Sequence, residues 1–298
     1  MPLNSKLLWS ICLVGWFVPN LLLAAEPSDM TGKEAGEMRE LAPGMKFHWC
    51  PPGKFRIGSP ATELGDGGQR NSNEDQVEVT LTKGFWMGET EVTQGQWLKI
   101  HGTRPWKGRS LVKEGDDFPA TYVCFQLFYD PKNTDNALEF CQRLTAQERK
   151  SGKLPKGWKF SLPTESQWEY ACRAGTTTTY SFGDDALKLG DYAWANENAS
   201  DIGEKYAHQV GLKKANPWGL KDMHGNLWEM CVDGYEPQHK GGTDPLQEGK
   251  EPKVRVYRGG CWNRDGVYCR SAFRAPLPII MQARNLGFRV IAVPEEGQ

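Results

Sequence analysis

The chain has 298 residues, and its 36 Lys and Arg residues against 37 Asp and Glu residues give a formal charge of -1. This balance removes any global electrostatic reason to expect nucleic acid or an anionic membrane as the main partner. Hydrophobic residues make up 39% of the chain and aromatic residues 11%, which is enough for a packed core and excludes a disordered chain. The 33 glycines are spread along the sequence and predict many turns, so we expect a loop-rich domain.

The N-terminus has the pattern of an export signal. Lys6 precedes an apolar run over 7–23, and small residues end the run at Ala25. This arrangement predicts a signal peptide over 1–25 and a periplasmic or secreted protein. An uncleaved membrane anchor is the alternative, but the run is short for a bilayer span and Pro19 interrupts it. We therefore expect no stable membrane insertion after cleavage.

The rest of the chain is predicted to form one domain, because no Pro/Ser-rich or charged linker divides it. We expect a polar linker over 26–40, the domain over 41–294 and a short tail over 295–298. Of the 8 cysteines, Cys12 lies in the leader, so seven remain after cleavage. An odd number leaves at least one thiol without an intramolecular partner in an oxidising compartment. The sequence has no CxxC pair, which excludes zinc ribbons and thioredoxin-like motifs.

Three helices are predicted from their capping residues and apolar spacing. Thr93 with Gln96, and Thr164 with Gln167, have the spacing of capping boxes. A glycine follows each predicted helix and favours its termination. The predicted helices run from Thr93 to Gly102, from a cap at Thr134 or Asp135 to about Lys150 with Gly152 beyond it, and from Thr164 to Gly175.

Beyond residue 175 the pattern changes to short aromatic strands and long loops. The predicted strands along the whole chain cover 47–57, 77–81, 254–258, 271–274 and 287–293. Short, separated strands combined with a few helices indicate an α+β fold with antiparallel pairing and little regular secondary structure.

The segment 222–229 brings acidic side chains and main-chain carbonyls together around a glycine within eight residues. Oxygen ligands of this kind suit a hard cation such as calcium. The alternative is a tight turn that places Trp228 in the core, and the residues alone leave both open.

Five ordered blocks, taken together, closely resemble the sulfatase-modifying factor family, to which the formylglycine-generating enzyme belongs. These blocks are 84–97, 162–175, 216–229, 258–263 and 285–290, and the similarity extends from about residue 45 to 293. The resemblance implies a single domain with a fold related to C-type lectins, poor in regular structure and stabilised by calcium.

The resemblance also implies two calcium sites by position. The first would use the carboxylates of Asp222 and Glu229 and the main-chain carbonyls of Gly225 and Leu227. The second would lie near Asn196 and the carbonyl of Glu197, with Asp201 as a further ligand.

In the family enzyme, two cysteines five positions apart bind copper(I), and oxygen then converts a cysteine of an unfolded sulfatase segment into formylglycine. Cys269 matches the second of these cysteines, so the resemblance implies that it is catalytic and binds copper(I). Arg264 stands where the first should be, and a guanidinium cannot coordinate copper because it stays protonated. Cys261 lies three positions earlier and is the other candidate catalytic residue.

The roles of Cys261 and Cys269 stay open at this point. They are candidates for copper ligation after a local backbone change, for a structural disulfide, or for other redox use, and Cys269 could equally be a lone buried thiol. The sequence therefore supports two functions. One is an exported formylglycine-generating-like oxidase that acts on a cysteine of a sulfatase or another protein segment. The other is a noncatalytic, calcium-stabilised binding or scaffold module of the same fold.

Overall fold

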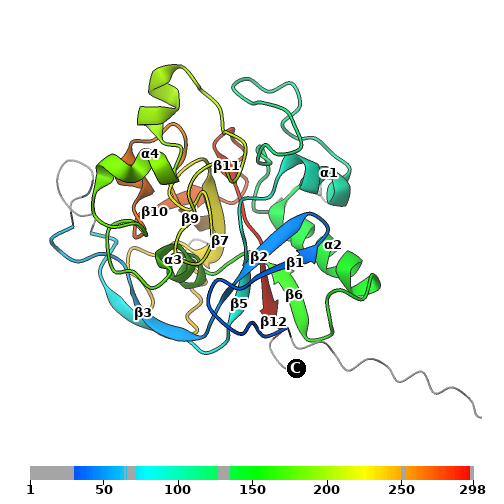
Figure 1. Cartoon of the computed structure of the whole chain (residues 1–298), viewed down its shortest axis with the longest axis horizontal. Helices are drawn as coiled ribbons and strands as arrows, with labels where there is room; N and C mark the ends of the chain where they lie inside the picture. Colours follow the sequence, from blue (N-terminus) through cyan, green and yellow to red (C-terminus); the bar gives the residue numbers. More distant parts are fainter. Residues whose placement is uncertain (1–29, 64, 66–71, 127–134, 250–252, 296–298) are drawn as a thin grey trace, which may run out of the picture.

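The computed structural model describes residues 30–63, 65, 72–126, 135–249 and 253–295 (Figure 1). The predicted signal peptide over 1–25 lies outside the described residues. Short strands and connecting loops dominate the described part of the chain, as expected for an α+β fold with little regular secondary structure. Within this part, no helix combines the length and the apolar character needed to cross a bilayer.

A five-stranded antiparallel sheet joins the two ends of the domain. In spatial order its strands are β1 (Met38–Ala42), β2 (Met45–Cys50), β5 (Phe85–Gly88), β12 (Ile291–Pro294) and β6 (Trp158–Ser161). Figure 1 shows α1 (Gln94–His101) and α2 (Ala137–Lys150) beside this sheet. Trp97 of α1 stacks on Phe140 of α2 with ring centroids 5.6 Å apart, and Phe288 meets both rings edge-on. This aromatic cluster fixes the two helices to the sheet.

Two smaller sheets and α3 complete the domain. The four-stranded sheet has the order β10 (Arg274–Pro278), β9 (Val254–Arg258), β7 (Trp228–Gly234) and β11 (Leu286–Gly287), and the three-stranded sheet has the order β3 (Gly53–Ile57), β4 (Val77–Leu81) and β8 (Gly242–Thr243). Helix α3 (Glu165–Arg173) packs against β3, β7 and β9 and so connects both sheets. The short α4 (Leu189–Tyr192) lies in the loop-rich half, at the top of Figure 1.

The predictions for the first and third helices are confirmed. Thr93 and Thr164 each accept a hydrogen bond from the backbone of the residue three positions on, and both capping boxes are complete. Gly102 adopts a left-handed conformation after α1, with φ 74°. The second helix begins later than predicted, because Asn136 caps α2 by accepting a hydrogen bond from the Glu139 N–H.

The strand predictions hold only in part. The predicted strand over 47–57 is two strands in different sheets, since Pro51 and Pro52 separate β2 from β3 and cannot donate to a ladder. The strand predicted over 271–274 lies too early, because β10 begins only at its last residue, Arg274. Before it, the Ser271 N–H donates to the Thr179 carbonyl, and the Arg258 guanidinium donates to the carbonyls of Ala272 and Phe273.

The fold also begins earlier than the predicted boundary at residue 41. Met30 is buried, and its carbonyl accepts a hydrogen bond from the indole of Trp86 at 2.6 Å. Strand β1 starts at Met38, inside the stretch predicted as linker. The polar composition of this stretch hides the strand from sequence analysis, because β1 is an edge strand with outward-facing charged residues.

Candidate functional site

The residues that match the copper-binding block lie in a tight loop between β9 and β10. Gly259 and Gly260 follow β9 with φ values of 95° and 72°. A Cβ on Gly260 would lie 2.5 Å from the Cys269 sulfur and 3.0 Å from its Cα. Only glycine allows this approach, so the turn places Cys261 beside the short 3-10 helix Gly266–Cys269.

Both candidate cysteines are fully buried thiols. The Cys261 thiol donates to the Asn263 side-chain oxygen at 3.1 Å, and the Asn285 amide lies 3.6 Å from the same sulfur. Burial raises the pKa of Cys261 to about 12 and raises the pKa of Cys269 well above its ordinary value. The two do not form a disulfide, which leaves the interpretation of Cys269 as a lone buried thiol in agreement with the structure.

His224 orients Cys269, a role that the sequence did not indicate. Burial lowers the pKa of His224 to about 4, so its ring is neutral at ordinary pH. Its Nδ1 lies 2.9 Å from the Cys269 carbonyl and its Nε2 lies 3.1 Å from the backbone N–H of Ser181. The neutral tautomer that satisfies both contacts has its proton on Nδ1 and holds the backbone of Cys269 in place.

Arg264 is exposed, and its guanidinium lies 5.6 Å from the centre of the Tyr268 ring. Copper(I) needs soft thiolate ligands that converge on one point. The Cys261 thiol already donates to Asn263, and burial raises the pKa of both cysteines. Copper binding by Cys269 stays a prediction.

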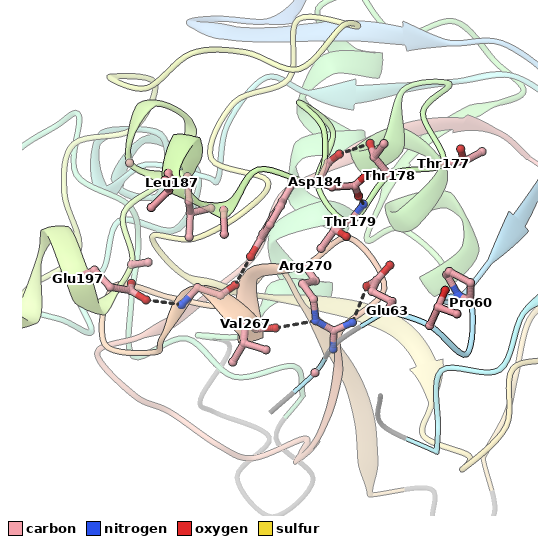
Figure 2. A pocket seen from close by; sticks show the side chains of 18 of the residues that line it. Pro60, Glu63, Thr177, Thr178, Thr179, Asp184, Leu187, Glu197, Val267 and Arg270 are labelled. Atoms are coloured by element: carbon pink, nitrogen blue, oxygen red, sulfur yellow. Dashed lines mark hydrogen bonds and ion pairs between the residues drawn. The ribbon is translucent and has the colours of Figure 1, made fainter. Parts of the chain in front are cut away.

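A cavity of about 1040 Å³ lies beside the Cys269 loop and is lined by Gly266, Val267 and Arg270 of that loop, of which Figure 2 labels Val267 and Arg270. Tyr180, Leu189 and Ala195 line the cavity and also pack on Cys269 from the same cluster. Leu187 and Glu197 lie on one side of the cavity in Figure 2, and Thr177 lies on the other. This size is at the upper end of the range for ligand pockets, about 300–1,000 Å³, so it exceeds the needs of one small side chain.

The cavity wall is acidic. Arg270 is the one Lys or Arg among the described lining residues, and all its hydrogen bonds run into the protein. Its guanidinium donates to Glu63 at 2.6 Å and to Glu74 at 2.8 Å, and its Nε donates to the Val267 carbonyl at 2.9 Å. Asp184 and Glu197 add exposed carboxylates. An anionic ligand would be repelled, whereas a cationic group finds complementary charge.

Asp222 adopts a left-handed conformation with φ 59° and is fully buried, and one of its oxygens accepts from the Gly211 N–H at 2.6 Å. Its second oxygen, Oδ1, has no hydrogen-bond partner among the described residues. A Cβ on Gly225 would lie 2.3 Å from the Trp194 carbonyl, and Leu227 is buried just before β7. The orphaned oxygen of Asp222 fits a cation ligand.

Glu229 has a different environment. Both of its oxygens accept from the Arg289 guanidinium at 2.6 Å, and the Trp168 indole donates to one of them at 2.7 Å. A carboxylate that accepts hydrogen bonds from a guanidinium with both oxygens already has a positive countercharge. Among the described residues, no three His, Cys, Asp or Glu side chains converge as a metal-binding group. Calcium binding by Glu229 stays a prediction, and the hydrogen bonds that its two oxygens already accept argue against it.

The residues predicted for a second calcium site connect two loops. The Asn196 N–H donates to the Arg264 carbonyl at 2.9 Å and its side chain donates to Asp265 at 3.0 Å. Glu197 accepts from the Gly266 N–H at 2.8 Å, and Asp201 is exposed in a neighbouring 3-10 helix. These contacts position the Cys269 loop, and calcium binding at this place stays a prediction.

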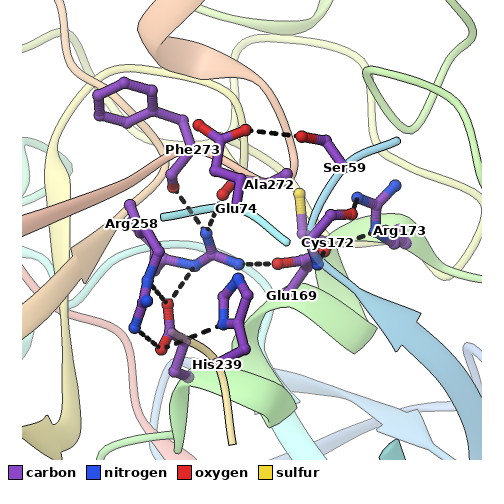
Figure 3. Close-up of polar contacts among 12 residues, drawn as sticks. Ser59, Glu74, Glu169, Cys172, Arg173, His239, Arg258, Ala272 and Phe273 are labelled. Atoms are coloured by element: carbon purple, nitrogen blue, oxygen red, sulfur yellow. Dashed lines mark hydrogen bonds and ion pairs between the residues drawn. The ribbon is translucent and has the colours of Figure 1, made fainter. Parts of the chain in front are cut away.

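In the described part of the chain, five buried arginines, each paired with a buried glutamate, form the framework around these sites. The pairs are Arg173 and Arg258 with Glu169, Arg270 with Glu74, Arg274 with Glu165, and Arg289 with Glu229. Figure 3 shows Arg258 and Glu169 meeting end to end, with Arg173 also donating to Glu169 at 2.8 Å. The adjacent His239 is neutral, because burial lowers its pKa to about 3. Because these side chains are buried, we assign the network a role in stabilising the fold.

Comparison with known proteins identifies the family of this chain. Residues 34–293 match the family described as the sulfatase-modifying factor enzyme 1-like domain. The formylglycine-generating enzyme of Mycobacterium tuberculosis is 34% identical over 158 residues, which are 46% of this chain and 52% of the relative. That of Streptomyces coelicolor is 32% identical over 210 residues, 65% of this chain and 59% of the relative. The matches thus span a little over half the length of these relatives.

The fold has a solved counterpart as well. The structure of PvdO from Pseudomonas aeruginosa superimposes with a TM-score of 0.71 at 22% sequence identity, covering 89% of this chain and 100% of that one. The expected formylglycine-generating-enzyme-like architecture is therefore confirmed. Since the family match covers most of the chain, the protein belongs to the sulfatase-modifying factor family.

Proposed function

We propose that this chain is an exported, noncatalytic binding module of the sulfatase-modifying factor family, which takes an extended polypeptide segment into the cavity beside the Cys269 loop. One observation carries the proposal. Cys261 and Cys269 are fully buried thiols, and Arg264 stands exposed where the family places its first copper ligand. The chain therefore has a large cavity beside Cys269 but lacks one cysteine of the family's copper-binding pair.

The cavity chemistry favours a segment with a basic residue next to an apolar one. Asp184 and Glu197 attract a cationic side chain, while Leu187 is 96% exposed at the cavity rim. A leucine so exposed gains from covering its apolar surface when a ligand docks. An unfolded segment of a sulfatase or another exported protein offers both kinds of side chain in extended form.

The second candidate function is a formylglycine-generating-like oxidase. It is favoured by the place of Cys269, which belongs to one buried cluster with the cavity-lining residues Tyr180, Leu189 and Ala195. Movement of these three side chains would expose one thiol to a bound segment, and Arg264 in place of the first copper-binding cysteine is the main argument against the reaction.

A peptide oxidation assay separates the two functions. The purified chain is incubated with copper(I), oxygen and a Cys-X-Pro-X-Arg peptide, and the products are analysed by mass spectrometry. We expect no aldehyde, because Arg264 stands in place of the first copper-binding cysteine and a guanidinium cannot coordinate copper. A relative that carries both copper cysteines serves as the positive control. Aldehyde formed by the parent and lost in Cys269→Ala would establish the oxidase in place of the binding module.

We expect Leu187→Ser to weaken binding of a fluorescent Ser-X-Pro-X-Arg peptide about tenfold, since a buried leucine side chain is worth about 1.5–3 kcal/mol. The serine in the peptide removes the reactive thiol and leaves the rest of the segment unchanged. Fluorescence anisotropy measures the dissociation constant. Ile202→Ser is the matched control, because Ile202 is 64% exposed and does not line the cavity. Equal losses in the two variants would place the docking surface elsewhere.

A further inference from the structure

Three neighbouring side chains each keep a buried hydrogen-bond donor without a hydrogen-bond partner among the described residues. The donors are the indole N–H of Trp262, the hydroxyl of Thr121 and the Nε–H of Arg284. Trp262 is 1% exposed and Thr121 is 2% exposed, so neither side chain is open to bulk solvent. Buried polar atoms are rarely left unpaired, and three of them in one region point to a bound group.

The three side chains belong to one narrow cleft. Thr121 and Arg284 both line it. The guanidinium carbon of Arg284 lies 5.9 Å from the centre of the Trp262 ring. Trp262 also packs in one buried cluster with Ala207, which is a further lining residue of the cleft. Trp262 therefore lies beside the cleft, and its unpaired indole is close to the unpaired guanidinium.

The cleft is cationic. Its described lining residues include Lys113 and Arg284 but no Asp or Glu. Arg284 forms no hydrogen bond or ion pair with another described residue, so its charge is available to a ligand. The three unpaired atoms are all donors, and a ligand that satisfies them must supply acceptor oxygens and negative charge. The larger cavity beside Cys269 has the opposite character, because Asp184 and Glu197 line it.

The shape of the cleft selects the class of anion. A guanidinium can pair with both oxygens of a carboxylate and also with phosphate or sulfate. A carboxylate is flat, whereas phosphate and sulfate are tetrahedral and need a wider space. The cleft is narrow, which favours the flat group. Arg284 is half-buried and has no hydrogen-bond partner among the described residues, so its side chain can move to admit a ligand without breaking such a contact.

We infer that Arg284, Trp262 and Thr121 bind the carboxylate group of a ligand in this cleft. Arg284 supplies the countercharge, and the indole and the hydroxyl supply neutral donors. The same group is present in a small free carboxylate and in an acidic side chain of a polypeptide. The site does not rest on the polypeptide binding proposed above, because the cleft and the larger cavity share no described lining residue.

A titration of the purified chain with sodium acetate tests this inference. The indole N–H signals are followed by NMR after nitrogen-15 labelling, sodium chloride keeps the ionic strength constant, and Trp262→Phe identifies the Trp262 signal. We expect this signal to shift and saturate with acetate, because the indole gains an acceptor. Arg284→Gln should weaken acetate binding by more than about tenfold, since it removes the charged donor. Thr121→Val removes a neutral donor and should weaken binding about threefold.

Arg264→Gln is the matched control. Arg264 also lies over an aromatic ring, 5.6 Å from the centre of Tyr268, but it does not line the cleft, so acetate affinity should be unchanged. Full acetate affinity in Arg284→Gln would overturn the assignment. A parent whose Trp262 signal does not respond to acetate, or responds equally to chloride alone, would overturn the site itself.

Two capped peptides identify the source of the carboxylate. Acetylated and amidated Gly-Gly-Asp-Gly-Gly is compared with the same peptide carrying Asn in place of Asp. Tighter binding of the Asp peptide than of acetate, with no binding of the Asn peptide, supports an acidic polypeptide as the ligand. An Asp peptide that binds no better than acetate supports a small free carboxylate. Leu187→Ser should leave acetate binding unchanged, so this site and the proposed polypeptide binding are tested separately.

Discussion

Replacing Glu229 by alanine is expected to lower the free energy of unfolding by about 3–5 kcal/mol, because it leaves the guanidinium of Arg289 buried without its countercharge. The Trp168 indole loses its acceptor in the same step. Urea denaturation followed by tryptophan fluorescence measures the change. The loss should be similar in calcium and in chelator, since both carboxylate oxygens of Glu229 accept hydrogen bonds from Arg289.

Glu78→Ala is the control for this experiment. Glu78 faces Arg56 at 3.7 Å on the surface, and an exposed pair of this kind contributes little to stability. We expect only a small change in the denaturation midpoint. If Glu229→Ala destabilised the chain only in the presence of calcium, Glu229 would be a metal ligand and the buried ion pair would carry little energy.

Gly260→Ala is expected to lower the free energy of unfolding by about 2–4 kcal/mol, combining left-handed strain with overpacking. The added methyl group would meet the Cys269 sulfur at 2.5 Å and the Tyr268 carbonyl at 3.0 Å. Differential scanning calorimetry of parent and variant measures the effect. The neighbouring cavity should also change shape, so peptide binding is expected to weaken in the same variant.

Gly44→Ala isolates the backbone contribution. Gly44 has the same φ of 72° as Gly260, but a Cβ there meets no atom within 4 Å. It should therefore cost about 1–2 kcal/mol, the price of left-handed backbone alone. Equal losses in the two variants would mean that the Cys269 loop moves freely and does not pack against the turn.

Local signals explain which parts of the fold could be predicted. The capping boxes at Thr93 and Thr164 satisfy the first N–H groups of their helices within four residues, so the sequence alone identifies them. Strand β7 was not predicted because most of its residues are buried, which removes the alternation of apolar and polar positions. For the same reason, the local sequence pattern does not show that Trp228 begins a buried strand.

Distant pairing explains what the sequence could not predict at the candidate sites. Glu91 accepts a hydrogen bond from the Asn226 amide, which lies more than a hundred residues later, and nothing in its own neighbourhood distinguishes it from Glu89. Arg289 lies within an apolar run, next to Phe288, and such an isolated charge is the one available signal of a buried ion pair. Its partner Glu229 cannot be chosen from spacing, because the chain closes that contact only in three dimensions.

The seven cysteines in the described part of the chain are all buried, and none forms a disulfide. Maleimide labelling in the native state should therefore follow transient opening of the packed interior, since a hidden thiol reacts only when solvent reaches it. Cys141 and Cys172 belong to two separate hydrophobic clusters, so site-resolved labelling can measure the rate at which each cluster opens. A reductant, by the same logic, should leave the thermal transition where it is.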